Sequence, residues 1–321
     1  MIVDAHQHPF WHGRDGAALL ADMDAHGIDR AWLLTWEVPP AEDAPSFHGH
    51  FNPVHARADG THPGLPLADV LRLRDAHGER FVAGYCPPAG LATAAALFEA
   101  AVRMHGVRVC GEWKCRMLLD DPRCLELFAK AGELGCPVVV HLDVPYLPDA
   151  ETRRPVYQPA WYGGTVANLA RALAACPRTA FLGHGPGFWR EISGDADSAP
   201  GVYPDGPVAP GGRLGGLFEA HDNLYADLSA GSGLGALKRD PDHAVAFLTR
   251  FADRLLFGRD QCGGDLLEFL SALPLPDDAR AKLYSANADR LLADDTVLPR
   301  TPPDALKPKR RLRRRTPKRG A

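Results

Sequence analysis

Short apolar runs alternate with longer segments of helical periodicity along most of this chain, and this alternation constrains the fold more than any other feature. Eight of the runs are short and rich in apolar residues, and each is followed by a segment in which apolar residues recur with the period of a helix. Strands that alternate with helices in this way indicate βαβ units and a parallel sheet. A chain of 321 residues can hold all of these units in one domain.

The eight predicted strands cover residues 2–5, 30–36, 80–86, 107–114, 137–142, 179–184, 223–228 and 254–258. The helices predicted between and after them lie near residues 15–26, 67–77, 91–105, 122–134, 165–175, 212–220, 242–251 and 265–272, and a closing helix is predicted at 277–293. Eight strands and helices of this size predict a (β/α)8 barrel, or TIM barrel, whose active site lies at the carboxyl ends of the strands. We expect the long loops 36–66 and 192–212 to wall the site.

Histidine and aspartate stand at the ends of four of these strands, where the apolar runs stop. The first strand ends in His6 and His8, the fifth in His141, the sixth in His184 and the eighth in Asp260. Side chains along a strand alternate between its two faces, so His6 and His8 point to the same side. The barrel topology brings all four strand ends to one rim, and we therefore expect a metal site there.

Neutral imidazoles together with a carboxylate suit zinc or another first-row divalent ion. Such an ion lowers the pKa of a bound water toward about 7, which gives a hydroxide-like nucleophile near neutral pH. Asp260 is expected to bind the metal and to take the proton from that water. His184 is expected to transfer a proton at the substrate or to stabilise an oxyanion from outside the ligand set.

The fourth strand adds Glu112 and Lys114, which share one face. Three arrangements are open from the sequence. In the first, Glu112 or Lys114 binds a metal ion and bridges it to a second ion, and in the second the two side chains form an ion pair with each other. In the third arrangement, Lys114 binds a carboxylate of the substrate. Trp36 and Trp189 lie just beyond strand ends, and an aromatic pocket for a flat substrate would place them against it. Loop packing is the alternative for both tryptophans.

These motifs resemble the amidohydrolase superfamily over residues 1–293. The resemblance depends on His6-x-His8, on His141, on the turn Gly183-His184-Gly185, on Leu256-Phe257-Gly258-Arg259-Asp260 and on the closing Asn287-Ala288-Asp289-Arg290-Leu291-Leu292. The last of these is similar to the ending of the amidohydrolase-related branch, which includes aminocarboxymuconate semialdehyde decarboxylase. The resemblance implies a distorted TIM barrel with one zinc ion bound by His6, His8, His141 and Asp260, and a catalytic His184 outside the ligand set.

Two reactions fit this site, and one alternative does not need it. The first is hydrolysis of a small amide, lactone or related carbonyl compound by a metal-activated water, and the second is non-oxidative decarboxylation of an unsaturated or aromatic acid. The alternative is a non-catalytic protein whose basic carboxyl-terminal tail binds nucleic acid, but the complete ligand set argues against it. A small-molecule substrate is thus the expected partner, and the sequence leaves a homodimer open.

The seven cysteines are odd in number and include no C-x-x-C pair, which favours reduced thiols in a cytoplasmic protein. Neither a signal peptide nor an apolar run long enough to span a membrane is recognised. The net charge of −4 divides unevenly, because residues 307–319 carry nine Lys or Arg and no acid. We therefore expect a catalytic domain at 1–296 and a disordered tail at 297–321, the one segment that could touch nucleic acid.

We predict that removal of residues 305–321 leaves the melting temperature, the metal content and the turnover of small substrates unchanged. The segment has only two sizeable apolar residues, Leu306 and Leu312, and cannot bury enough surface to offset roughly 1–2 kcal/mol per residue of backbone ordering. Only its binding to polyanions, which weakens steeply with salt, should be lost. Unfolding of the truncated protein, or a lower kcat on small substrates, would place the domain boundary elsewhere.

Overall fold

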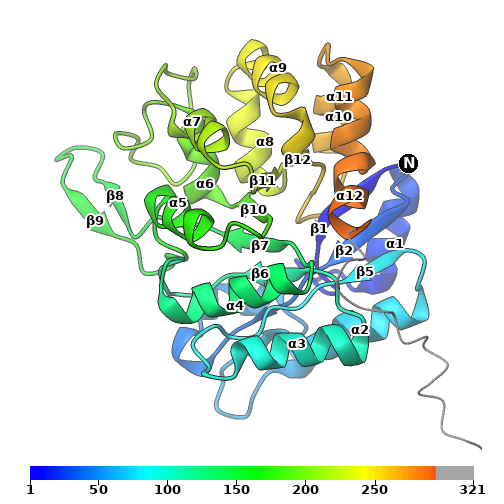
Figure 1. The fold of residues 1–321 in the computed structure, drawn as a ribbon. Helices are drawn as coiled ribbons and strands as arrows, with labels where there is room; N and C mark the ends of the chain where they lie inside the picture. Colours follow the sequence, from blue (N-terminus) through cyan, green and yellow to red (C-terminus); the bar gives the residue numbers. More distant parts are fainter. Residues whose placement is uncertain (294–321) are drawn as a thin grey trace, which may run out of the picture.

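A computed structural model describes residues 1–293, so the predicted tail lies outside the described part of the chain. Two parallel sheets, in the orders β1-β2-β5 and β12-β11-β10-β7-β6, form a barrel surrounded by helices (Figure 1). Their strands are β1 (Val3–Gln7), β2 (Arg30–Leu33), β5 (Phe81–Ala83), β6 (Cys110–Trp113), β7 (Val138–His141), β10 (Phe181–His184), β11 (Leu224–Asp227) and β12 (Leu255–Leu256). The eight predicted strands and the predicted TIM barrel are confirmed.

Backbone hydrogen bonds join the two sheets at both seams and thus close the barrel. At one seam Gly84 and Val109 form a parallel bridge, and the Tyr85 amide donates to the Val109 carbonyl at 2.9 Å. At the other seam the Ala5 amide donates to the Phe257 carbonyl at 2.9 Å. The strands are assigned to sheets of three and five strands, and these hydrogen bonds connect the two sheets into a closed ring.

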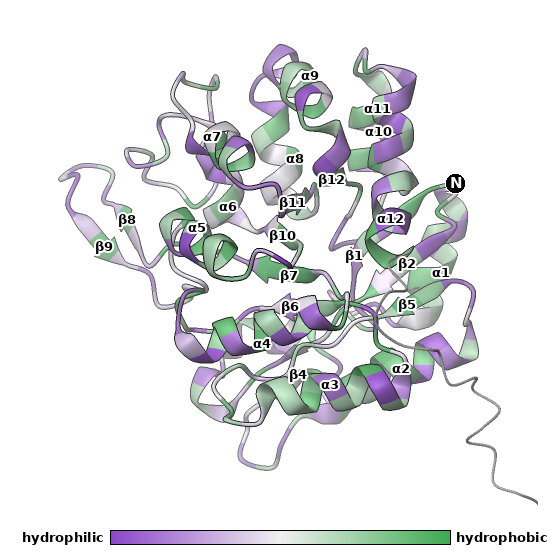
Figure 2. Ribbon diagram, in the orientation of Figure 1, coloured by the Kyte–Doolittle hydropathy of each residue, from purple (hydrophilic) through white to green (hydrophobic). Residues whose placement is uncertain are grey.

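Helices cover the outside of the barrel in the predicted order. They are α1 (Gly16–Ala25), α2 (Leu67–Ala76), α3 (Ala94–His105), α4 (Pro122–Glu133), α5 (Val166–Ala175), α7 (Arg213–Ala220), α9 (Pro241–Arg250) and α10 (Asp265–Ala272). Aspartate caps begin several of them, as at α1, where the Asp15 side chain accepts from the Ala18 amide at 2.9 Å. In Figure 2 α3 and α4 carry both hydrophobic and hydrophilic residues, whereas β7 is mostly hydrophobic. No helix of residues 1–293 is long and apolar enough to cross a membrane.

Several elements were not predicted, and most of them follow strand ends. The loops there contain α6 (Pro186–Trp189), α8 (Ala230–Lys238), the antiparallel pair β3 (Trp36–Glu37) and β4 (Gly64–Leu65), and the pair β8 (Tyr146–Pro148) and β9 (Pro155–Tyr157). Short 3-10 helices at Pro40–Glu42, Pro45–His50 and Pro53–His55 fill the loop between β3 and β4, while two more, at Arg190–Ile192 and Ala252–Arg254, lie farther along the chain. The closing helix is divided into α11 (Asp277–Ala281), a π-helical turn (Lys282–Ala286) and α12 (Asn287–Ala293).

Two hydrophobic cores hold the barrel together. The larger lies between the strands and the surrounding helices, and the smaller fills the barrel with residues from nearly every strand and from the closing helix: Val3, Ala5, Trp32, Leu34, Val109, Val139, Leu182, Leu256 and Ala288. The interior below the rim is therefore solid, as in other TIM barrels. Space for a ligand is left only at the carboxyl ends of the strands.

Arg259 ties the last strand to the first from a buried position. Its Nε donates to Asp4 Oδ2 at 2.7 Å and its Nη1 donates to Asp22 Oδ2 at 2.7 Å. The Asp4 carboxylate is fully buried and also accepts from the backbone amides of His6 and Arg259. This network fixes the backbone next to Asp260, so it helps to position the Asp260 side chain at the rim.

We predict that Arg259→Met lowers the free energy of unfolding by about 3–5 kcal/mol, because it leaves the Asp4 carboxylate buried without its cation. The measurement is chemical denaturation of the metal-free protein. Arg250→Met is the control, since the Arg250–Glu219 pair is exposed on the surface and should contribute less than about 1 kcal/mol. Equal effects of the two substitutions would show that the Arg259 network does not stabilise the barrel.

Candidate metal centre

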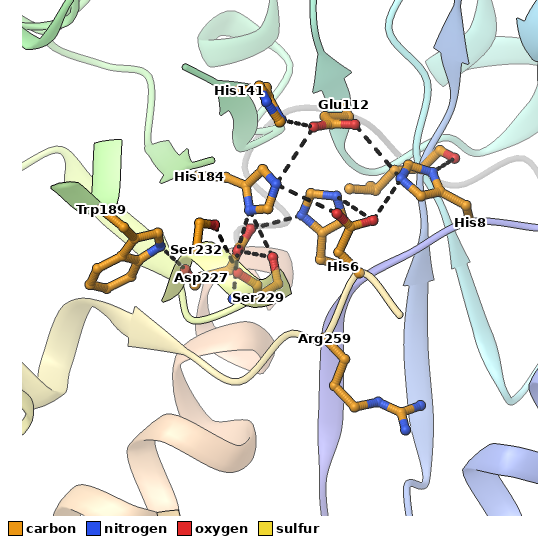
Figure 3. A network of polar contacts seen from close by, with 12 residues as sticks. His6, His8, Glu112, His141, His184, Trp189, Asp227, Ser229, Ser232 and Arg259 are labelled. Atoms are coloured by element: carbon orange, nitrogen blue, oxygen red, sulfur yellow. Dashed lines mark hydrogen bonds and ion pairs between the residues drawn. The ribbon is translucent and has the colours of Figure 1, made fainter. Parts of the chain in front are cut away.

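Six side chains predicted from the sequence converge at the rim of the barrel (Figure 3). They are His6, His8, Glu112, His141, His184 and Asp260, and they form three overlapping groups whose ligand atoms lie within 4.8 Å of one another. The groups are His6, His8 and Glu112; His6, His184 and Asp260; and Glu112, His141 and His184. The polar residues predicted at the strand ends therefore meet at the rim, although they are as much as 254 positions apart in the sequence.

Asp227, at the end of β11, orients two of the histidines. Its Oδ2 lies 3.0 Å from His6 Nδ1, and its Oδ1 lies 3.0 Å from His184 Nδ1. Ser229 Oγ contacts both Asp227 Oδ1 and His184 Nδ1. An ionised carboxylate only accepts, so each imidazole donates through Nδ1 and turns the lone pair of Nε2 toward the rim.

His8 is oriented by the backbone instead, because its Nδ1 donates to the Leu34 carbonyl at 2.9 Å. Its Nε2 then lies 3.2 Å from Asp260 Oδ1 and 3.7 Å from Glu112 Oε2. His184 Nε2 is 3.7 Å from both Glu112 Oε1 and Asp260 Oδ2. Both carboxylates therefore lie within 3.7 Å of His8 Nε2 and of His184 Nε2.

His141 is placed differently from the other three histidines. Its Nδ1 lies 2.7 Å from Glu112 Oε1 and its Nε2 lies 2.9 Å from Asp143 Oδ2. Both ring nitrogens of His141 therefore contact carboxylates. An ion that binds Nδ1 would have to displace the proton on that nitrogen. His141 joins the cluster through Glu112 and His184, and it shares no three-residue group with His6 or His8.

The donor set fits a divalent cation. His6 Nε2, His184 Nε2 and Asp260 Oδ1 are buried and have no hydrogen-bond partner among the described residues, and unsatisfied buried polar atoms are costly. Two ligands at about 2.1 Å from a tetrahedral ion lie about 3.4 Å apart, close to the 3.2 Å and 3.7 Å found between His8 and the two carboxylates. A cation bound by His6 and Asp260 would satisfy two of these atoms and would leave His184 Nε2 facing the same space.

The carboxylates are ionised at neutral pH although they are buried. Burial acts to raise the pKa of Glu112, but the charges of Lys114 and His141 hold it well below its usual range. Burial also opposes ionisation of Asp260, and His6 and His8 outweigh it and lower the pKa to about 2. The site therefore offers negative charge to a cation without first losing carboxyl protons.

Asp260 reaches the site from a left-handed backbone conformation, with φ at 53°. This conformation costs most residues other than glycine roughly 1 kcal/mol. The Asp260 amide donates to the His6 carbonyl at 2.9 Å, and Arg259 is fixed by its carboxylate partners. The sharp turn directs the carboxylate back over the barrel mouth toward His6 and His8.

Comparison with solved structures places this architecture among known barrels. An uncharacterised TIM-barrel protein from Bordetella bronchiseptica has a TM-score of 0.59 at 18% identity, covering 91% of this chain and 98% of that one. The 5-carboxyvanillate decarboxylase of Sphingomonas paucimobilis has a TM-score of 0.52 at 18% identity, covering 85% and 82%. A candidate 2-pyrone-4,6-dicarboxylic acid hydrolase from Pseudomonas putida has a TM-score of 0.53 at 15% identity, covering 91% and 97%.

These similarities show that the chain has the TIM-barrel fold of the solved structures. Other similar structures include an amidohydrolase and further decarboxylases of dihydroxybenzoic acids, one of them with bound manganese. The sequence itself matches no protein-family model and no curated protein. At these identities the comparisons establish only the architecture, so the reaction must follow from the residues of this chain.

Lys114 does not form the ion pair with Glu112 that the sequence left open, since no acid of residues 1–293 lies within 4 Å of its ammonium group. The ammonium instead lies 4.0 Å from the centre of the Trp36 ring. Trp36 is buried in an aromatic cluster at the barrel mouth, consisting of Trp11, Trp36, Phe47, Phe51 and Tyr162. Its indole Nε1 donates to the Lys114 carbonyl at 3.2 Å, so Trp36 contacts Lys114 through both its face and its edge.

Trp189 does not face the mouth of the barrel. The side chain is completely buried, packs against Phe188 and Phe247, and donates from Nε1 to the Asp227 carbonyl at 3.1 Å. The predicted contact with substrate is not available from this position. Trp189 instead supports the strand end that carries Asp227.

A hollow of about 210 Å³ opens beside the cluster. Its lining includes His8 and Trp11, and the other residues around it are Gln7, His12, Arg14, Leu19, Gln261 and Cys262. Because His8 belongs to the metal-ligand candidates and Trp11 to the aromatic cluster, the hollow connects the two. A small ligand can therefore reach the rim from this side.

Sequence reasoning missed Asp227, although the signal that found the other residues was present. Asp227 follows Tyr225 and Ala226 at the end of the seventh predicted strand, as His184 does at the end of the sixth. Asp143 was missed as well, two residues beyond His141. A search for polar residues at every strand end, including aspartates that orient histidines, would have included Asp227.

We predict that Asp227→Asn weakens metal binding by roughly 10–100-fold, because an amide no longer holds both imidazoles in the tautomer that presents Nε2. Competition with a chromogenic chelator measures the dissociation constant. Asp222→Asn, at an exposed turn before the same strand, is the matched control. Unchanged affinity in Asp227→Asn would mean that the carboxylate does not orient the ligands.

Proposed function

We propose that this chain is a metal-dependent hydrolase of small carbonyl compounds such as amides or lactones. One observation supports this most directly: the buried, unpartnered Nε2 atoms of His6 and His184 and Oδ1 of Asp260 face the same space at the rim. A structural role would satisfy these atoms within the protein. Side chains held ready for a cation are a recurrent basis of metal-assisted hydrolysis.

Zinc is the ion we propose, because imidazole and carboxylate ligands in a buried site suit it. His6, His8 and Asp260 would hold it, with Glu112 or His141 completing the set. Glu112 belongs to two of the three residue groups, and it could therefore also serve a second ion beside His141. A bound divalent cation would supply Lewis acidity and a water of lowered pKa.

The remaining chemistry belongs to the side chains. Asp260 is an ionised carboxylate whose Oδ1 has no hydrogen bond in the described structure, so it can accept a proton from the attacking water. His184, supported by Asp227 and Ser229, can take up a proton at Nε2 and then donate it to the leaving group or to the carbonyl oxygen. The buried rim excludes bulk water, which strengthens these interactions.

A metal-dependent, non-oxidative decarboxylase is the second candidate. It is favoured by the similarity in fold to decarboxylases of aromatic acids, at 18–19% identity. In that reaction the rim residues would bind the acid, and His184 or Asp260 would first take up a proton from water and then deliver it to the carbon that loses CO2. The two candidates share the site and differ in whether water is consumed.

The deciding experiment combines elemental analysis of the purified protein with a substrate panel of amides, lactones and aromatic or unsaturated carboxylates. Hydrolysis incorporates oxygen from labelled water into the product, whereas decarboxylation releases CO2 without consuming water. A protein that binds no divalent metal, or His8→Ala protein with the same metal content as wild type, would refute the proposed site.

We predict that His184→Asn retains the metal but lowers kcat by roughly 10²- to 10⁴-fold, as expected for loss of a proton-transfer group. His105→Asn, at the exposed end of α3, is the control and should leave both quantities unchanged. Metal content and steady-state kinetics are measured on the same preparations. Loss of metal from His184→Asn would make His184 a ligand and favour a two-metal site that includes Glu112.

A further inference from the structure

His62 connects two parts of the loop between β3 and β4 through both of its ring nitrogens. The residue lies where the loop returns to β4, and it is 2% exposed. Its Nε2 donates to the Asn52 carbonyl at 2.9 Å, because a carbonyl only accepts. Its Nδ1 accepts from the Gly64 amide at 3.0 Å, because an amide only donates. Only a neutral ring with its proton on Nε2 satisfies both partners.

Gly64 is the anchored partner of His62. It pairs with Glu37 across the β3–β4 ladder, and its φ of 78° lies in the left-handed region. A Cβ at this position would overlap the Trp36 carbonyl oxygen, so the two strands approach each other closely. Asn52 belongs instead to the middle of the loop, where its side chain caps the 3-10 helix Pro53–His55. His62 therefore attaches the middle of the loop to its anchored end.

The attached part of the loop forms one wall of the barrel mouth. Phe51 is 3% exposed and stacks on His62, with 4.9 Å between the ring centres and 24° between the ring planes. The ring centres of Trp36 and Trp11 lie 5.3 Å and 5.8 Å from that of Phe51. Trp11 in turn lines the hollow beside His8. The position of the loop therefore determines how the aromatic cluster covers the mouth.

The charged and titratable groups around His62 come from the same loop and from α2. Asp43 Oδ1 accepts from the His62 amide at 3.1 Å and lies 2.8 Å from His48 Nε2, and the His48 ring is 5.9 Å from the His62 ring. His55 pairs with Asp69 of α2 at 2.6 Å. Asp43 thus contacts the backbone of His62, whereas the ring nitrogens face an amide and a carbonyl.

We propose that neutral His62 holds the β3–β4 loop over the barrel mouth and that protonation of its Nδ1 releases the loop. Proton uptake turns Nδ1 from an acceptor into a donor that faces the Gly64 amide, which is also a donor. Both donors then lack a partner in a buried position, and this favours an open loop in which the imidazolium is hydrated. The inference goes beyond the proposed function, because it concerns access to the rim and not the reaction there.

The direction of the pH effect follows from the two states of the loop. In an open loop the imidazole titrates near its ordinary pKa of about 6.5. In the closed loop burial lowers the pKa of His62, and the charges of His48 and His55 lower it further, against the hydrogen bond to Asn52 and the charge of Asp43. Protons therefore bind preferentially to the open loop. The closed loop is most stable above a pH of about 6.5 and loses stability as the pH falls below that value.

The other histidine pairs of the loop would act in the opposite direction. Protonation of His48 strengthens its pair with Asp43, and protonation of His55 strengthens its pair with Asp69. Both changes would close the loop further in acid. An opening in acid can therefore be assigned to His62 and not to these pairs.

Hydrogen–deuterium exchange of the full-length protein, corrected for the intrinsic pH dependence of exchange, measures the opening. Between about pH 7.5 and about pH 5.5, protonation of a group with a pKa of about 6.5 raises the open population by up to about tenfold. Peptides from residues 45–65 should lose protection by this factor at the lower pH, while peptides from β7 keep theirs. The β7 peptides show that the opening is local.

Two variants assign the response to His62. His62→Gln keeps a donor for the Asn52 carbonyl but does not titrate, so the protection of its loop should be the same at both pH values. His48→Gln is the matched control, since it removes another histidine of the same loop and should keep most of the wild-type response. A response that His62→Gln shares, or a wild-type loop whose protection does not change with pH, would overturn the proposal.

Heteronuclear NMR of histidine-labelled wild type tests the same idea without a substitution. The His62 signal, assigned by its absence from His62→Gln, should be that of a ring protonated at Nε2, with a pKa below about 6.5. A ring protonated at Nδ1, or a pKa above that value, would refute the role of His62. Neither measurement needs metal or substrate, so their outcome does not depend on the proposed function.

Acrylamide quenching of tryptophan fluorescence tests the effect on the mouth. Trp36 is 3% exposed beneath the loop residues Phe47 and Phe51. Its quenching should rise at the lower pH in wild type but not in His62→Gln, and Trp36→Phe identifies its share of the signal. Faster exchange of the loop without a rise in quenching would show that the mouth stays covered and would contradict the proposal.

Discussion

Buried carboxylates at the barrel rim impose the constraint on which the rest of the site depends. Asp227, Glu112 and Asp260 are ionised in a region with little solvent, and such charges are tolerated only when cations or hydrogen-bond donors surround them. Histidines from other strands supply these partners. Each strand end must therefore be at its correct position in the ring before the charges of the others are compensated, which couples the geometry of the centre to closure of the barrel.

The sequence predicted the barrel and the main rim residues because both depend on local, periodic signals. A β-rich run followed by a helical period identifies a βα unit, and a polar residue at the end of such a run lies at the rim whichever neighbours it has. Eight strands, the principal helices and the convergence of His6, His8, His141, His184 and Asp260 follow from this rule alone. Helix α8 was not predicted because its sequence, Ala230–Lys238, is rich in glycine, which is a poor helix former. Gly233 is needed there, since a Cβ would lie 2.4 Å from the Leu228 carbonyl oxygen.

Pairings between distant side chains were beyond the reach of the sequence. The period of a strand shows that Glu112 and Lys114 share a face, but it does not show that the Trp36 ring, from β3, lies 4.0 Å from the Lys114 ammonium. In the same way, Trp189 lies just past a strand end, and only the packing of α6 against its neighbours reveals that the indole turns inward to the Asp227 carbonyl. The direction in which such a side chain points depends on which other side chains pack next to it in the folded protein.

The closure between β12 and β1 has a consequence for the order in which the chain matures on the ribosome. His6 and His8 precede Arg259 and Asp260 by about 250 positions, because the latter two follow the last barrel strand. During synthesis nearly the whole domain must therefore be translated before Asp260 is available to His6 and His8. An ion bound by the completed rim would then connect the first and last strands of the barrel. Metal binding would therefore occur late and would stabilise the finished fold.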